Sequence, residues 1–269
     1  MEPQEPAGRV LIVAGSDSGG GAGIQADIKA VSAMGGYAAT AITAITVQNT
    51  LGVSAIHPVP DAIVEGQMRA VLDDIGADTV KTGMLGTAGV VGLVAGVLES
   101  LDTPLPLVLD PVMVATSGDR LVDDGTEAAI RERLVPLAAL VTPNIPEAAR
   151  LTGMPVEDIQ GQIAAAEKLM AMGARAALVK GGHLKGNAVA DVLVSTRGME
   201  IMERPRIGTK HTHGTGCTLA SAIAARLARG EALPEAVRKA GDYLHEAIAR
   251  APGYGQGKGP VDHMWVLRP

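Results

Sequence analysis

Short apolar segments alternate with helical repeats along most of the chain. The apolar segments, which are typical of strands buried on both faces of a sheet, lie at 10–14, 79–80, 107–109, 140–141 and 176–179. Between and after them, apolar residues recur three or four positions apart, which is typical of amphipathic helices. These helices are expected near 24–35, 61–75, 87–101, 124–134, 160–172, 216–228 and 234–250. The alternation predicts an α/β fold with a mostly parallel sheet covered on both faces.

Four further segments complete the predicted sheet. Residues 38–47 are rich in Thr, Ile and Val and are expected to form one strand, with a short strand near His57. Residues 191–196 and 199–202 are expected to form an antiparallel pair at one edge. No internal repeat or linker divides the chain, so a single domain is expected over residues 9–269.

The predicted parallel strands end in glycine or polar residues. These ends lie at 15–23, 81–83, 110, 142–144 and 180–182. A separate polar loop is expected at 116–119. In parallel α/β sheets, ligands bind beyond the carboxyl ends of the strands. One shared site at this edge is therefore expected, although each segment alone resembles an ordinary loop.

Composition narrows the class of protein. Of 269 residues, 47% are hydrophobic, and with no Phe and one Trp the core must be aliphatic. A net charge of −6 with few aromatic residues disfavours nucleic-acid binding. One cysteine excludes an intrachain disulfide and fits a reducing compartment. The acidic, proline-rich residues 1–8 are expected to be a disordered tail rather than a secretion signal, and no apolar run is long enough to span a membrane. A cytoplasmic protein is expected.

The segment 210–217 contains the densest cluster of candidate chemistry. Gly214 and Gly216 precede a helix, so several backbone N–H groups can face an anion at the positive end of the helix dipole. Cys217 lies in this turn, where a helix N-terminus favours a thiolate. A helix cap provided by Thr215 explains the same local sequence equally well.

Other motifs offer alternatives to this anion site. No Gly-x-Gly-x-x-Gly opens a predicted helix and no Gly-Lys-Ser/Thr occurs, which excludes the usual dinucleotide and P-loop motifs. His211, His213 and Cys217 could bind zinc, but no fourth ligand is evident. A Cys–His nucleophile pair is a further option, yet a glycine-rich anion turn suits phosphate better than an acyl oxyanion.

Two adjacent strand ends supply hard oxygen donors. Asp110, Asn144 and Glu147 suit a magnesium ion that shares its ligands with nucleotide phosphates. Asn144 also fits an ordinary turn, and Glu147 fits the first turn of a helix. Lys180, followed by two glycines, suggests backbone that approaches a ligand closely.

Several stretches, taken in order, resemble the hydroxymethylpyrimidine/phosphomethylpyrimidine kinases of thiamine biosynthesis. They lie at 14–27, 110–113, 142–147, 180–183, 211–217 and 257–263. The resemblance covers nearly the whole chain from Arg9. It implies a three-layer α/β/α ribokinase-like fold, the use of ATP and Mg²⁺, and two phosphorylations, first of the pyrimidine's hydroxymethyl group and then of the monophosphate. A small pyrimidine is the implied substrate, and a homodimer is expected.

The resemblance also implies site residues. An anion hole and catalytic position are implied at Gly214, Thr215, Gly216 and Cys217. The pyrimidine pocket is implied at Gln48, Gly15, Ala22, Asp27, Met84 and Val112, with Gln48 reading the ring's amine and nitrogen. The nucleotide side is implied at Lys180, His183, Asn144 and Thr215, with metal contacts at Asp110 and Glu147. Ser18-Gly19 departs from the Pro-Ser common in relatives.

Two rival functions remain open from sequence alone. A pyridoxal kinase would use the same scaffold, although Gln48 and the residues 211–213 favour a pyrimidine. A non-catalytic nucleotide-binding regulator would have no need of Cys217, Asp110 and Glu147 together.

Overall fold

The computed structural model describes residues 8–114 and 121–268, and within them eight strands form one sheet. The strands are β1 (Arg9–Ala14), β2 (Tyr37–Ile42), β5 (Thr79–Thr82), β6 (Leu107–Leu109), β7 (Ala138–Val141), β8 (Ala176–Val179), β9 (Ala188–Ser195) and β10 (Gly198–Pro205). Their order across the sheet is β10-β9-β8-β7-β6-β5-β1-β2. The strands from β2 to β8 in this order pair in parallel, whereas β9 and β10 are antiparallel. The predicted parallel sheet and antiparallel edge pair are both confirmed.

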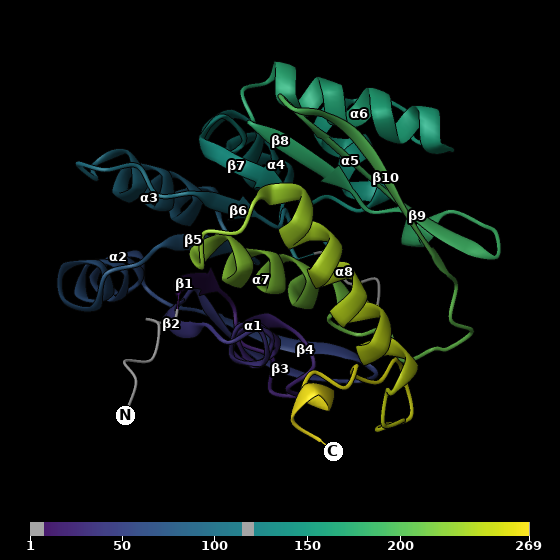
Figure 1. Ribbon diagram of the computed structural model, residues 1–269. Coiled ribbons are helices and arrows are strands. Elements are labelled where there is room, and N and C mark those ends of the chain that lie inside the picture. The colour runs from purple at the N-terminus through teal and green to yellow at the C-terminus, as the bar shows by residue number, and fades with distance from the viewer. Residues whose placement is uncertain (1–7, 115–120, 269) are drawn as a thin grey trace, which may run out of the picture.

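Helices cover both faces of this sheet (Figure 1). One face is covered by α1 (Gly23–Ala33), α7 (Thr215–Ala228) and α8 (Leu233–Ala249). The other is covered by α2 (Asp61–Ala70), α3 (Ala88–Glu99), α4 (Asp124–Ala129), α5 (Ile145–Thr152) and α6 (Ile159–Ala171). Single π-helical turns, Val71–Ile75 and Ile130–Leu134, extend α2 and α4. The three layers are those of an α/β/α fold.

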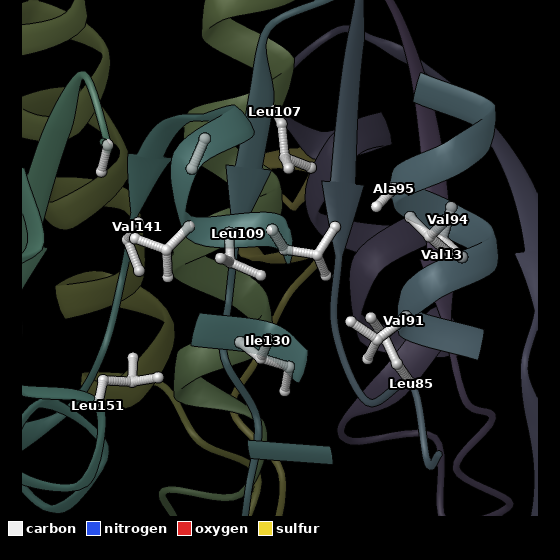
Figure 2. Close-up of a cluster of buried hydrophobic side chains, with 14 of the residues drawn as sticks. Val13, Leu85, Val91, Val94, Ala95, Leu107, Leu109, Ile130, Val141 and Leu151 are labelled. Carbon is white, nitrogen blue, oxygen red and sulfur yellow. The ribbon is translucent and has the colours of Figure 1, made fainter. Parts of the chain in front are cut away.

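Aliphatic side chains build the core, as the composition requires. On the α3 face, Val13 of β1, Leu109 of β6, and Val91 and Val94 of α3 belong to one cluster of buried side chains (Figure 2). All four are fully or almost fully buried. Burying such a side chain stabilises a fold by about 1.5–3 kcal/mol, so many small contributions hold the layers together without aromatic rings.

The chain between 37 and 58 differs from the prediction of one long strand. After β2 it leaves the sheet and forms β3 (Ala44–Asn49), which pairs antiparallel with β4 (Gly52–Pro58) in a separate two-stranded sheet. The bend is fixed at Thr43, whose N–H donates to Ala14 and whose hydroxyl donates to the carbonyl of Met84. Periodicity could not reveal this bend because both segments are rich in β-branched residues.

Other parts of the chain also bear on the predictions. The helix α5 is not among the expected helices, although Glu147 is expected to fit the first turn of a helix. Gly8 was assigned to a disordered tail, but it is buried and its carbonyl accepts a hydrogen bond from Tyr37. Residues 1–7 and the predicted polar loop at 116–119 lie outside the described residues. No helix in the described part of the chain is both long and apolar enough to cross a membrane.

Candidate active site

A cavity of about 610 Å³ opens at the carboxyl edge of the parallel strands. Its lining includes the predicted site residues Gly15, Ala22, Gln48, Met84, Asp110, Val112, Asn144, Glu147, Lys180, His183, Gly214, Thr215, Gly216 and Cys217. These residues come from five parallel strand ends, the two-stranded sheet and the start of α7. Four of the five predicted strand ends thus contribute to one cavity, whereas residues 81–83 are buried outside its lining.

Asp17 organises the glycine-rich loop after β1. Its Oδ1 accepts from the N–H of Gly19, and its Oδ2 accepts from Gly21 and Ala22 at 3.0 and 2.8 Å. The same Oδ2 lies 2.8 Å from Nε2 of His213. Burial raises the pKa of Asp17, but the hydrogen bonds outweigh it and the net shift is downward, so the carboxylate is charged. Sequence reasoning gave this residue no role, although an acid beside a run of glycines suits N–H binding.

The turn before α7 has a backbone that only glycine accommodates. Gly214 has φ of +79°, and a Cβ there would overlap the carbonyl oxygen of Gly21. Gly214 is the N-cap of α7, and within the described residues no side chain caps that end. Thr215 is the first helical residue, so the alternative that it simply caps the helix is wrong. The first turn therefore presents uncapped amides to the cavity, as an anion site requires.

The C-terminal segment supports this turn from behind. The N–H of His213 donates to the carbonyl of Gly259 at 3.1 Å. The ring of His263 lies 3.0 Å from the hydroxyl of Thr218 in α7, and Tyr243 of α8 donates to the carbonyl of His263. Burial lowers the pKa of His263 to about 4, so its imidazole is neutral and structural.

The predicted pyrimidine side is formed by the two-stranded sheet and the loop after β5. A bulge between Val47 and Gln48 breaks the alternation of β3 and places Gln48 in the cavity lining. The amide of Gln48 lies beside Thr46 and 3.5 Å from the ring of His213. Gly15 donates to the carbonyl of Met84 at 3.1 Å, and a Cβ at Gly15 would overlap the Met84 methyl group. The site thus has an amide beside an apolar wall.

The predicted nucleotide side carries a buried ion pair. Lys180 Nζ lies 3.1 Å from Asp110 Oδ1, and their side chains are 13% and 2% exposed. Burial lowers the pKa of Lys180, but the carboxylates of Asp110 and Glu147 more than reverse this. The net pKa is raised, so the amine is protonated. Asp110 Oδ2 has no hydrogen-bond partner among the described residues. A Cβ on Gly216 would lie 3.7 Å from that oxygen, so it faces the anion turn.

Asn144 and Glu147 form a reciprocal capping box at the start of α5. Asn144 Oδ1 accepts from the N–H of Glu147 at 3.0 Å, and Glu147 Oε2 accepts from the N–H of Asn144 at 2.8 Å. The ordinary turn and helix-start interpretations of these residues are therefore correct, while both also line the cavity. Burial raises the pKa of Glu147 to about 7 despite the nearby Lys180.

Burial of Cys217 works against the thiolate that the helix terminus is expected to favour. Cys217 is half-buried, and burial raises its pKa to about 12 against the opposing charge of Lys81. Desolvation here outweighs the helix terminus. No cluster of three or more candidate metal-binding His, Cys, Asp or Glu side chains occurs in the described ranges, so the zinc alternative is not supported.

His183 also lines the cavity. Burial and the charge of Lys180 lower the pKa of its imidazole.

Asp27 lies elsewhere than the resemblance implied. Its side chain is fully buried and absent from the cavity lining. It pairs with Lys81 Nζ at 2.8 Å and accepts from the hydroxyl of Ser221 in α7 at 2.7 Å. The ion pair lies between the sheet and the helices instead of in the pocket. The sequence placed Lys81 at a polar strand end facing the shared site, but the structure buries it within β5, outside the cavity lining.

Comparison with known proteins agrees with the fold. The family model for phosphomethylpyrimidine kinase matches residues 17–262. The thiamine biosynthesis bifunctional protein ThiED of Geobacter sulfurreducens is 51% identical over 96% of this chain, which spans 53% of that protein's length. The hydroxymethylpyrimidine/phosphomethylpyrimidine kinase of Streptomyces coelicolor is 48% identical over 96% of this chain and 95% of its own length.

The fold is likewise that of solved kinases. An ADP complex of a pyridoxal kinase from Bacillus subtilis has a TM-score of 0.90 and 35% identity, over 97% of this chain and 99% of that one. The expected ribokinase-like architecture is confirmed. The chain belongs to the phosphomethylpyrimidine kinase family.

Proposed function

We propose that this protein transfers the γ-phosphoryl group of ATP to 4-amino-5-hydroxymethyl-2-methylpyrimidine, and then a second group to the resulting monophosphate. The observation that carries the proposal is the cavity itself. The uncapped amides of α7 face Asp110 and Lys180 across one space, while Gln48 lines the other side. A full-length relative from Streptomyces coelicolor carries both activities in its name.

Each part of the cavity contributes to phosphoryl transfer. The backbone N–H groups at Gly216 and Cys217 stabilise charge on the transferred phosphoryl oxygens, which is where most catalysis of this reaction lies. Gln48 binds the amine and a ring nitrogen of the pyrimidine. Cys217 first releases its own proton to solvent, and the resulting thiolate accepts the proton of the substrate hydroxyl in the first step. The second step has a phosphate acceptor, so it depends on positioning two anions and needs little base chemistry.

The Asp110 side fits a magnesium ion bound with ATP. Asp110 Oδ2 is buried without a hydrogen-bond partner among the described residues and faces the anion turn, as a metal ligand would. The backbone N–H groups of Asn144 and Met113 both donate to the carboxylate of Glu147. This carboxylate would therefore act on the ion through water. Lys180, His183 and Asn144 would hold the nucleotide. When bound, the ion would neutralise phosphate charge.

Steady-state ADP release with three acceptors tests this function. We expect turnover with the hydroxymethylpyrimidine and with its monophosphate. Turnover with pyridoxal alone would favour the rival kinase, and no turnover with any acceptor would favour a regulator. Asp110→Asn should abolish both steps, whereas Asp78→Asn, a carboxyl outside the cavity lining, should leave them intact.

A homodimer is the proposed assembly. The face of the two-stranded sheet that lies opposite buried Thr46 carries Ile45 and Val47, which are 53 and 59% exposed. Such a patch is typical of a protein interface. Light scattering after size exclusion should give a dimer, and Val47→Glu should give a monomer; a wild-type monomer would refute the proposal. A cytoplasmic location fits both the use of ATP and a thiol that must stay reduced.

A further inference from the structure

A charged pair is buried beneath the first turn of α7, outside the cavity. Lys81 and Asp27 are both 0% exposed, and their side chains are 2.8 Å apart. Lys81 lies in β5, near the middle of the sheet, with Val80 before it buried on the opposite face. Asp27 belongs to α1, so the pair joins the sheet to the helix layer that includes α7.

Such a pair is a costly way to stabilise a core. Taking two charges out of water costs several kcal/mol each, and well-packed apolar residues of similar volume often stabilise a fold as well or better. This pair is also incompletely bonded, because Asp27 Oδ2 has no hydrogen-bond partner among the described residues. Stability alone does not account for it.

The pair is connected directly to the catalytic turn. Asp27 Oδ1 accepts a hydrogen bond from the hydroxyl of Ser221 at 2.7 Å. Ser221 lies four residues, or about one helical turn, after Cys217 in α7. The α1, β5 and α7 elements are therefore tied together one turn below the thiol. Any shift of Asp27 would move the start of α7 and its amides.

We propose that Lys81 and Asp27 are positioning residues, which hold the first turn of α7 through Ser221 and set the electrostatic balance at Cys217. The charged groups facing the thiol are Lys81 from β5, Asp27 from α1, and Asp110 and Lys180 from the ends of β6 and β8. The last two line the cavity, whereas neither member of the buried pair does. Its two members act on the thiol with opposite sign.

The pKa directions support this arrangement. Burial has the largest effect on Cys217 and raises its pKa. Lys81 opposes this effect by lowering the pKa, whereas Asp27 adds to it by raising the pKa. In turn, burial lowers the pKa of Lys81, but the negative groups around it reverse this and hold the ammonium charged. The consequence for catalysis rests on the proposed function, but the charge balance at the thiol does not.

The pH dependence of alkylation tests the proposal without any substrate. Cys217 is the sole cysteine and lines the cavity, so iodoacetamide reports on one thiol. Because alkylation follows the thiolate fraction, a shift of one pKa unit changes the rate about tenfold below the midpoint. Lys81→Met should slow alkylation about tenfold or more at pH 8, and Asp27→Asn should accelerate it by a similar factor. A purely structural role predicts changes of the same sign, because both variants loosen the same region.

Two further variants keep the test informative if a single change prevents folding. Ser221→Ala removes the tether without altering charge, so the pH dependence of alkylation should stay within about twofold of wild type while the first phosphorylation slows. The double variant Lys81→Met with Asp27→Leu removes both charges, so its alkylation rate should lie between those of the single variants. Equal alkylation rates in all four variants would overturn the proposal. Shifted alkylation in an enzyme that phosphorylates no pyrimidine would overturn the proposed function alone.

Discussion

The carboxylate of Asp17 lies 2.8 Å from Nε2 of His213, although 196 residues separate them in the chain. The same carboxylate accepts three N–H groups of the glycine-rich loop. One buried side chain therefore connects the loop after β1 to the turn that begins α7. This link places the predicted pyrimidine wall and the predicted anion hole in one rigid unit.

Replacing Asp17 by Asn should destabilise the protein in a pH-dependent way. Asn retains the shape but presents an N–H₂ group to N–H donors, and leaving such buried groups unsatisfied costs about 1–3 kcal/mol. The net pKa of Asp17 is lowered in the folded state, so its stabilising effect is present above the usual aspartate pKa and is lost as pH falls through the folded value. The melting-temperature gap between wild type and variant should be widest near neutrality and narrow below about pH 4.

Asp78 provides the matched control for this measurement. Its pKa is also lowered, through the hydrogen bonds and charge of Arg9, but it lies outside the cavity lining. Asp78→Asn should show the same trend in stability with pH and normal pyrimidine turnover. Equal loss of turnover in both variants would mean that Asp17 acts through general stability and not through the two loops.

Gly214→Ala should be more damaging than its backbone conformation alone requires. A non-glycine residue with positive φ costs about 1–2 kcal/mol, and here a Cβ would also displace the Gly21 backbone. Gly230→Ala is the matched control, since Gly230 has φ of +80° and no atom within 4 Å of the added Cβ. Urea unfolding should show a larger loss for Gly214→Ala, and only that variant should lose phosphoryl transfer. Similar effects of the two changes would show that the contact with Gly21 has no functional weight.

Gln48→Ala should weaken pyrimidine binding selectively. Loss of a two-point hydrogen bond costs about 1–3 kcal/mol, which corresponds to roughly fivefold to 150-fold in Kd. ATP affinity should change by less than about twofold, because the amide of Gln48 lies beside Thr46 and His213 and makes no contact with Asp110 or Lys180 among the described residues. Isothermal titration with each ligand measures both constants. Asn49→Ala, which alters the next residue of β3 outside the cavity lining, should change neither, and parallel losses for the two ligands would refute the reading role of Gln48.

Cys217→Ala should separate the two phosphorylations. Removing a general base slows a reaction by about 10²–10⁴-fold, so the first step should fall in that range while pyrimidine affinity is preserved. The second step should slow much less. Because burial raises the pKa of the thiol to about 12, the wild-type rate of the first step should rise with pH between 6 and 9. An unchanged first step in the variant would leave anion binding as the turn's only role.

Local patterns predicted much of the fold and the position of the site. The apolar run at 10–14 and the polar residues after each strand depend on short segments, so their edge of the sheet could be inferred. The split between β2 and β3 could not, because Thr43 bends the chain through contacts with Ala14 and Met84. The capping box of Asn144 and Glu147 shows that two interpretations, helix start and cavity lining, apply to the same residues.

Sequence alone determined the layered α/β architecture and the edge that carries the cavity, because periodicity and strand-end chemistry are local properties. Tertiary structure decided the state and place of individual groups. Asp27 is buried with Lys81, 54 positions away, instead of lining the pocket. Burial of Cys217 works against the thiolate that the helix terminus is expected to favour. Desolvation and distant charges set both outcomes, and neither is written in the spacing of residues along the chain.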